Sequence, residues 1–337
     1  MTDRRTFLRA LAASAATTSL SAQDAQTTSD KLGQRLPTRV IGKTKEAITA
    51  LTIGGSHAEK CESEKVSQEI IETAIEVGIR SFDNARLYGG GNAEVVYGKL
   101  LTPKYRDHIY LTTKTLAKDG ASARKELETS LRNMKTDRID LWQIHSITSA
   151  TDVDSRWNNG VIDEFLKARE EGLVRHLGFT GHRSPSAHLR MIERLRGEKF
   201  TFDTCLMPMN LVDPHYDSFI VQVLPKLIED DYGIFAMKTL AHGNMLAAET
   251  SGHNTPTVEG IGTIADTDLT VADMHRYVYS LPICSLVSGC LKPTEVKANA
   301  RILKEFKGLD NETRDQLLAQ AKPFAGNTME YYKGKPI

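Results

Sequence analysis

The sequence predicts a single α/β domain that folds as a (β/α)8 TIM barrel. Eight short apolar runs alternate with stretches in which apolar residues recur at helical spacing, as Val66, Ile70 and Ala74 do. This alternation predicts parallel βαβ units, and eight such units close a barrel. The length of 337 residues suits one large domain of this kind. A doubly wound open sheet is the alternative fold.

The barrel domain is predicted to span residues 31–337, with a short hairpin from Leu36 that caps its bottom and a short C-terminal extension after Phe306. The predicted strands are Ala50–Ile53, Ile79–Phe82, Ile109–Thr113, Ile139–Ile144, Val174–Phe179, Phe202–Met207, Ile234–Met237 and Ile283–Val287. Among the predicted helices are Val161–Glu170, Pro185–Leu195, Phe219–Ile228, Val271–Tyr279, Val296–Phe306 and Arg314–Ala321.

Composition argues against several classes of protein. Lysine plus arginine and aspartate plus glutamate both number 43, so no global field favours nucleic acid. No apolar run is long enough to give the mature chain a stable membrane span. The four cysteines lack the spacing of a metal site, and no metal centre is expected.

The first 30 residues have the pattern of an export signal and linker. Arg4 and Arg5 precede a mildly apolar run rich in alanine, serine and threonine. The arginine pair, with Phe7 and Leu8 after it, resembles a twin-arginine (Tat) signal. We therefore expect the Tat machinery as a partner and the periplasm as the destination. A basic tail that is not used for export, in a cytoplasmic protein, is the alternative.

Polar side chains stand at the ends of three neighbouring predicted strands. Asp83 ends the second strand and Tyr88 follows it in a glycine-rich turn, Lys114 ends the third strand, and His145 ends the fourth. The carboxyl ends of barrel strands are where catalytic residues of this fold lie. A lysine there is costly to bury unless a carboxylate such as Asp83 pairs with it. A stabilising ion pair, a packed tyrosine and a core histidine are the alternative interpretation.

At these residues the chain resembles the aldo-keto reductases, from about Leu36 to Phe306. The lysine strand and the Ile-Asp-Leu-x-x-Ile-His strand match the family, as does the motif Asp-x-Ala-x-x-Tyr-Gly, followed by Glu and Gly-x-Leu. That motif comprises Asp83, Ala85, Tyr88, Gly89, Glu94, Gly98 and Leu100.

The resemblance implies reduction of an aldehyde or ketone to an alcohol by hydride transfer from a nicotinamide. Tyr88 would be the general acid, and Lys114 would lower its pKa toward the working pH. Asp83 would hold Lys114 in place, and His145 would orient the substrate oxygen.

The resemblance also implies a nicotinamide site at the barrel mouth. NADP(H) is expected more than NAD(H), because Lys292 suits a 2′-phosphate, although Glu295 would repel one. The expected cofactor contacts are Gly55, Ser56, Asp83, Thr180, Gly181, Met237, Lys238, Leu240, Gly289, Lys292 and Asn299. The expected substrate pocket is formed by His57, Tyr88, His145 and Met209.

Two other functions remain open. Gly181, Leu206 and Met237 depart from the residues that the family usually places around the nicotinamide. These departures argue for the alternative of a non-catalytic barrel that binds nucleotide as a sensor or binds a partner, whereas Asp83, Tyr88, Lys114 and His145 argue against it. An isomerase or lyase using the pair of Lys114 and Asp83 is the second alternative.

Overall fold

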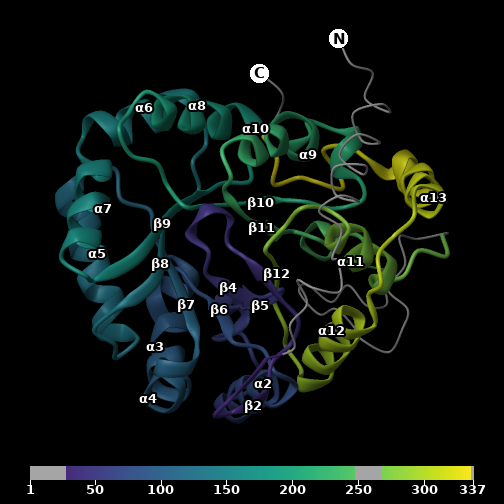
Figure 1. Cartoon of the computed structure of the whole chain (residues 1–337), viewed down its shortest axis with the longest axis horizontal. Helices are drawn as coiled ribbons and strands as arrows, with labels where there is room; N and C mark the ends of the chain where they lie inside the picture. The colour runs from purple at the N-terminus through teal and green to yellow at the C-terminus, as the bar shows by residue number, and fades with distance from the viewer. Residues whose placement is uncertain (1–27, 247–266, 335–337) are drawn as a thin grey trace.

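A closed barrel of eight parallel strands forms the centre of the computed structural model, which describes residues 28–246 and 267–334 (Figure 1). Each strand pairs with its neighbours in the chain, and β12 pairs with β5 to close the ring. The strands are β5 (Leu51–Gly54), β6 (Ser81–Asp83), β7 (Tyr110–Thr115), β8 (Ile139–Ile144), β9 (Val174–Thr180), β10 (Thr204–Pro208), β11 (Gly233–Met237) and β12 (Ser285–Ser288). All eight predicted strands are confirmed, and the open sheet is excluded.

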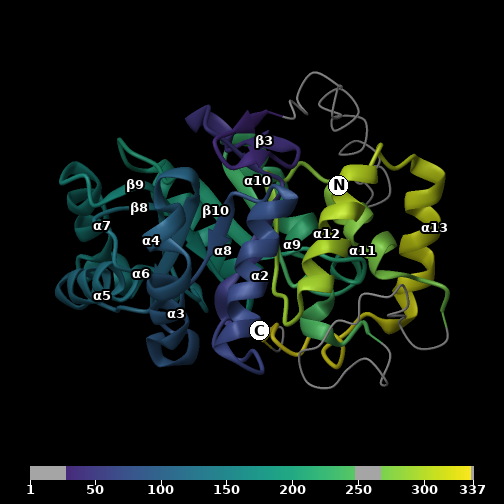
Figure 2. The ribbon, with the colours of Figure 1, turned by 90° about the horizontal axis from the view of Figure 1, so that it is seen from below.

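Helices surround the barrel as an outer ring (Figures 1 and 2). Their apolar faces and the outward faces of the strands form one continuous core. The helices of eight residues or more are α2 (Glu64–Val77), α3 (Asn92–Leu100), α5 (Gly120–Asn133), α6 (Ala150–Asn158), α7 (Val161–Glu170), α8 (Pro185–Arg196), α11 (Val271–Tyr279), α12 (Pro293–Glu305) and α13 (Asn311–Ala321).

One predicted helix is broken in two. The stretch from Phe219 to Ile228 forms α9 (Phe219–Gln222) and α10 (Leu224–Glu229) instead of one helix. Pro225 is the reason, because a proline cannot donate the backbone hydrogen bond of a helix interior and its ring clashes with the preceding turn. The short α4 (Thr102–Tyr105) also begins with a proline in its first turn.

The predicted hairpin at the bottom of the barrel is confirmed. It pairs β3 (Thr38–Val40) with β4 (Ala47–Thr49). Ile41 and Ile48 of this hairpin are buried in a small apolar cluster with side chains of the barrel strands, among them Leu141 and Phe235. The cluster closes this end of the barrel, so a ligand can enter only at the opposite end.

The ordered fold begins earlier than residue 31. Ser29 and Asp30 form β1, which pairs with β2 (Gly33–Gln34). The carboxylate of Asp30 accepts hydrogen bonds from Arg80, with Nε to Oδ2 at 2.7 Å. Because Arg80 is buried, this ion pair fixes the N-terminal hairpin to the start of β6. Ser29 and Asp30, which were predicted to belong to the linker, therefore pack with the barrel domain.

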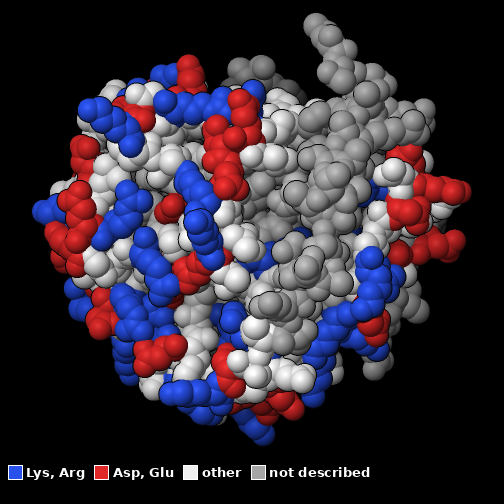
Figure 3. All heavy atoms as spheres, viewed as in Figure 1, with Lys and Arg blue, Asp and Glu red and all other residues white. Residues whose placement is uncertain are grey.

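On the face seen in Figure 3, the described residues carry positive and negative side chains that are interspersed. Within residues 28–246 and 267–334, no helix combines the length and apolar character needed to cross a bilayer. The same residues contain no group of three or more His, Cys, Asp or Glu side chains arranged to hold a metal ion. The four cysteines are free thiols, and three of them are buried in the core.

Candidate active site

Three adjacent strands bring an acid, a lysine and a histidine to one rim of the barrel. Asp83 is the last residue of β6 and lies in register with Thr112 of β7. Lys114 follows two residues further along β7, and His145 comes directly after β8. The backbone N–H of His145 donates to the carbonyl oxygen of Thr115, which extends the pairing of β7 and β8 to the rim.

Tyr88 reaches the same point from the loop after β6. The three glycines that follow it, Gly89, Gly90 and Gly91, all have positive φ angles, from 55° to 104°. Residues with a side chain rarely adopt this backbone, so the glycines allow the chain to reverse into α3 directly after Tyr88. The Tyr88 ring then lies edge-on to the ring of His145, with centroids 5.7 Å apart.

Asp83 and Lys114 form a buried ion pair. The ammonium of Lys114 donates to both carboxylate oxygens of Asp83 and to the carbonyl oxygen of Asn84, each at 2.6 Å. Burial alone would lower the pKa of Lys114, but the charges and hydrogen bonds of Asp83 and Tyr88 outweigh it and raise that pKa. Lys114 therefore stays cationic beneath the phenol.

The phenol of Tyr88 keeps its proton more firmly than the sequence suggested. Lys114 Nζ lies 5.1 Å from the centroid of the Tyr88 ring, and its charge and hydrogen bond lower the pKa of the phenol. Burial acts in the opposite direction and is larger, so the pKa of Tyr88 is raised above its ordinary value. Lys114 therefore acts on this pKa in the expected direction, but burial outweighs its effect.

His145 is neutral in this environment. Burial, assisted by the charge of Lys114, lowers the pKa of His145 well below its ordinary range. Its Nδ1 atom is buried and has no hydrogen-bond partner among the described residues. A neutral imidazole can present an N–H to a ligand oxygen, so its tautomer matters more than its charge.

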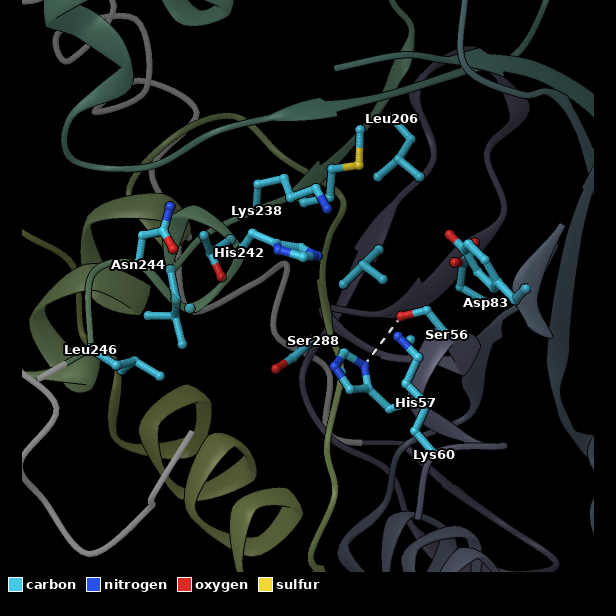
Figure 4. Close-up of a pocket in the computed structure, with 18 of the residues that line it drawn as sticks. Ser56, His57, Lys60, Asp83, Leu206, Lys238, His242, Asn244, Leu246 and Ser288 are labelled. Carbon is cyan, nitrogen blue, oxygen red and sulfur yellow. Dashed lines mark hydrogen bonds between the residues drawn. The ribbon is translucent and has the colours of Figure 1, made fainter. Parts of the chain in front are cut away.

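A cavity of about 650 Å³ opens beside these groups at the carboxyl ends of β5, β6, β10, β11 and β12 (Figure 4). Its volume is in the range of cofactor and ligand sites. Eight of the predicted site residues line it: Ser56, His57, Asp83, Tyr88, Met237, Lys238, Leu240 and Gly289. The lining combines apolar and polar side chains, as a nicotinamide ring on a polar nucleotide would require. The apolar ones are Leu206, Met237, Leu240 and Val287, and the polar ones include Ser56 and Ser288.

The other predicted residues lie outside the cavity lining, namely Gly55, Lys114, His145, Thr180, Gly181, Met209, Lys292 and Asn299. Met209 is completely buried in the core, so it does not form a pocket wall. Asn299 is also buried, and its amide donates to Ser288 Oγ at 3.1 Å and contacts Cys290 Sγ at 3.6 Å. Asn299 therefore positions β12 and the turn after it.

Glu295 serves the backbone of α12. One of its carboxylate oxygens accepts the backbone N–H groups of Leu291 and Lys292 at 2.7 and 3.3 Å. The other oxygen is buried and has no partner among the described residues, and burial raises the pKa of the group. Its negative charge is thus directed toward the helix start and away from solvent.

Sequence reasoning missed several residues that line the cavity. Lys60 comes from the segment after β5, His242 and Asn244 from the segment after β11, and Tyr331 from the C-terminal extension. Asn244 Nδ2 donates to the carbonyl of Met329 at 2.9 Å, and Tyr331 OH and His242 Nδ1 are hydrogen-bonded at 2.6 Å. The tail therefore returns to the mouth of the barrel. The aromatic pair Tyr331-Tyr332 in a polar tail was the available signal.

These features are those of a carbonyl-reducing barrel, and comparison with known proteins agrees. The model of the aldo/keto reductase family matches residues 50–307. The chain therefore belongs to the aldo/keto reductase family. This membership supports an oxidoreductase that binds a nicotinamide nucleotide and reduces carbonyl groups.

Individual relatives are distant. The chain is 25% identical to the uncharacterized oxidoreductase YqkF of Bacillus subtilis over 284 residues, covering 74% of this chain and 88% of that protein. It is 34% identical to the methylglyoxal reductase DkgA of Yersinia pestis over 125 residues, 36% of this chain and 42% of that one. The solved holo form of aldo-keto reductase AKR11C1 from Bacillus halodurans has the same fold, with a TM-score of 0.65 and 21% identity. That alignment covers 88% of this chain and all of the other.

Proposed function

We propose that this chain reduces an aldehyde or ketone to an alcohol with NADPH, and that Tyr88 is the general acid. The observation that carries the proposal is the buried pair of Asp83 and Lys114, which lies beneath the Tyr88 ring and next to His145. A structural ion pair alone would not require a phenol and a neutral imidazole at the edge of a ligand-sized cavity.

The residues divide the chemistry as follows. A bound nicotinamide supplies the hydride, and the surface formed by Met237, Leu240 and Gly289 would hold it. The neutral His145 orients the carbonyl oxygen through a hydrogen bond. Tyr88 donates its proton to that oxygen as negative charge develops there. Lys114, held by Asp83, stabilises the phenolate that remains.

The test is an assay in which the mature chain is mixed with NADPH and a reactive aldehyde, and the absorbance of NADPH is followed at 340 nm. We expect consumption that saturates with aldehyde concentration. Nucleotide binding without consumption would favour the sensor interpretation. Conversion of the carbonyl compound without any change in NADPH would favour an isomerase or lyase that uses Lys114 and Asp83.

Lys292 is expected to determine the choice of cofactor. We expect NADPH to bind more tightly than NADH. Lys292→Met should raise the dissociation constant for NADPH about tenfold, which is the range of one charge-assisted hydrogen bond. NADH affinity should not change, because NADH lacks the 2′-phosphate. Dissociation constants from quenching of protein fluorescence check this, and tighter binding of NADH by the unaltered chain would contradict it.

We further propose that the chain is exported by the Tat route with its nucleotide already bound. The double substitution Arg4→Lys and Arg5→Lys keeps both charges but removes the twin-arginine pair, so it should abolish most export. Cell fractionation with an antibody against the barrel measures this. The exported protein should release nicotinamide nucleotide when it is denatured. Undiminished export of the variant would leave the protein cytoplasmic or exported by another route.

A further inference from the structure

Lys238 is a cation in the lining of the cavity that no carboxylate of the described chain neutralises. It follows β11 directly, with a φ of 57°, in the left-handed region that residues with a side chain rarely adopt. Its backbone carbonyl accepts a hydrogen bond from the buried Asn210 at 3.2 Å, which helps to hold this turn. The strained turn places the lysine side chain in the lining of the same cavity as Tyr88 and Asp83.

The ammonium of Lys238 forms no ion pair within residues 28–246 and 267–334. Its Nζ atom lies over the face of the Tyr332 ring, 5.6 Å from the ring centroid. Asp83 is the single carboxylate in the described lining of the cavity, and Lys114 already occupies both of its oxygens. Burying an ammonium without a counter-charge is unfavourable unless a ligand supplies one.

The charge of Lys238 acts on the imidazoles around the mouth. Burial is the main cause of the lowered pKa values of His57, His145 and His182, and Lys238 lowers each of them further. In Figure 4, Lys238 and His242 face His57 and Lys60 across the cavity. Lys238 and Lys60 therefore place a positive charge on each side of the cavity. Lys238 itself has a pKa lowered to about 8 by burial and by Lys60, so most molecules remain protonated at neutral pH.

We propose that Lys238 binds an acid group of the substrate, so that the substrate is a carbonyl compound which also carries a carboxylate or a phosphate. The inference rests on the proposed reductase function. A compact ammonium suits such a group as a point charge. Because Lys238 and Tyr88 line the same cavity of about 650 Å³, one small molecule can place its carbonyl at Tyr88 and its acid group at Lys238.

The nucleotide offers the same chemistry, since its phosphates are also anions. Lys238 is one of the residues first expected to contact the cofactor, so the experiment must separate the two sources. Kinetics with a matched pair of substrates do this: 4-formylbenzoate carries the acid group, and its methyl ester presents the same aldehyde without the charge.

We expect the unaltered chain to have a lower KM for 4-formylbenzoate than for the ester. Lys238→Met, which keeps the length of the side chain but removes the charge, should raise KM for the acid about tenfold. The KM for the ester should rise less than the KM for the acid, and Lys238→Arg should restore much of the preference for the acid. Equal KM values for acid and ester in the unaltered chain would overturn the proposal.

Two further measurements assign the role to the right group. If Lys238→Met weakens NADPH binding tenfold and raises the KM for the acid and the KM for the ester equally, Lys238 binds the nucleotide and the proposal fails. Lys60→Met is the matched variant on the opposite side of the cavity. If it, and not Lys238→Met, removes the preference for the acid, the site belongs to Lys60 and the assignment to Lys238 is wrong.

Direct binding separates this proposal from the reductase function itself. Calorimetric titration of 4-formylbenzoate into the unaltered chain and into Lys238→Met requires no turnover. Binding that is lost in the variant, without consumption of NADPH in any assay, would keep the acid site and reject the reductase. Consumption of NADPH with the ester, together with acid binding that does not depend on Lys238, would keep the reductase and reject the acid site.

Discussion

Tyr88→Phe is expected to lower kcat for aldehyde reduction by about 10² to 10⁴, the range that a positioned general acid contributes. The variant loses only the phenolic oxygen, and its ring can keep the packing against His145 and Lys114. The dissociation constant for NADPH should therefore change little. Steady-state consumption at 340 nm and fluorescence titration measure the two quantities on the same preparation.

Tyr105→Phe is the matched control. This hydroxyl also has a close acidic partner, since it donates to Glu72 Oε2 at 2.5 Å, but α4 lies outside the cavity lining. Its turnover should equal that of the unaltered chain. Turnover retained in Tyr88→Phe would remove Tyr88 from the acid role. A large rise in the NADPH dissociation constant would instead assign Tyr88 to cofactor binding.

The barrel and the four central residues could be predicted because their signals are local. Buried parallel strands require apolar runs, and Asp83, Lys114 and His145 stand out where those runs end. Parallel strands that follow one another in the chain lie side by side in the barrel, with their carboxyl ends at the same rim. The three residues are therefore expected to lie close together from their positions in the sequence alone. α7 (Val161–Glu170) was predicted with its observed bounds for the same reason, as its apolar residues repeat at helical spacing.

What could not be predicted depends on distant parts of the chain. The raised pKa of Tyr88 comes from burial in the folded chain, which the sequence does not reveal. Met209 follows a strand end, as a pocket residue would, but the core covers it completely. Tyr331 reaches the cavity because the tail returns to the barrel mouth, where Asn210 and Asp213 bind residues of the tail that lie 120 positions later in the chain.

The tail is held by a buried cluster of charges. The ammonium of Lys333 donates to Asp213 Oδ1 at 2.7 Å, to Glu330 Oε2 at 2.8 Å and to the carbonyl oxygen of Tyr216 at 2.7 Å. All three charged side chains are fully inaccessible to solvent. Asn210 donates to the second oxygen of Glu330 at 3.0 Å, so the cluster connects the tail to the loop after β10.

Lys333→Met is expected to reduce the free energy of unfolding by about 3–5 kcal/mol, the usual result of removing one partner from a buried ion pair. The substitution fills similar volume but leaves Asp213 and Glu330 buried without a cation. Urea denaturation followed by circular dichroism measures the loss. Lys99→Met is the control, because the pair of Lys99 and Glu64 is exposed to solvent and screened, and it should cause no measurable change.

The double variant Lys333→Met, Glu330→Gln tests the cause. If uncompensated charge destabilises the single variant, removing one of the two carboxylates should recover part of the loss. Hydrogen exchange over residues 326–334 shows whether the tail detaches before the barrel unfolds. A loss below about 1 kcal/mol in the single variant, or no recovery in the double variant, would contradict this account. Because Tyr331 lies between Glu330 and Lys333, release of the tail would also withdraw a wall of the cavity.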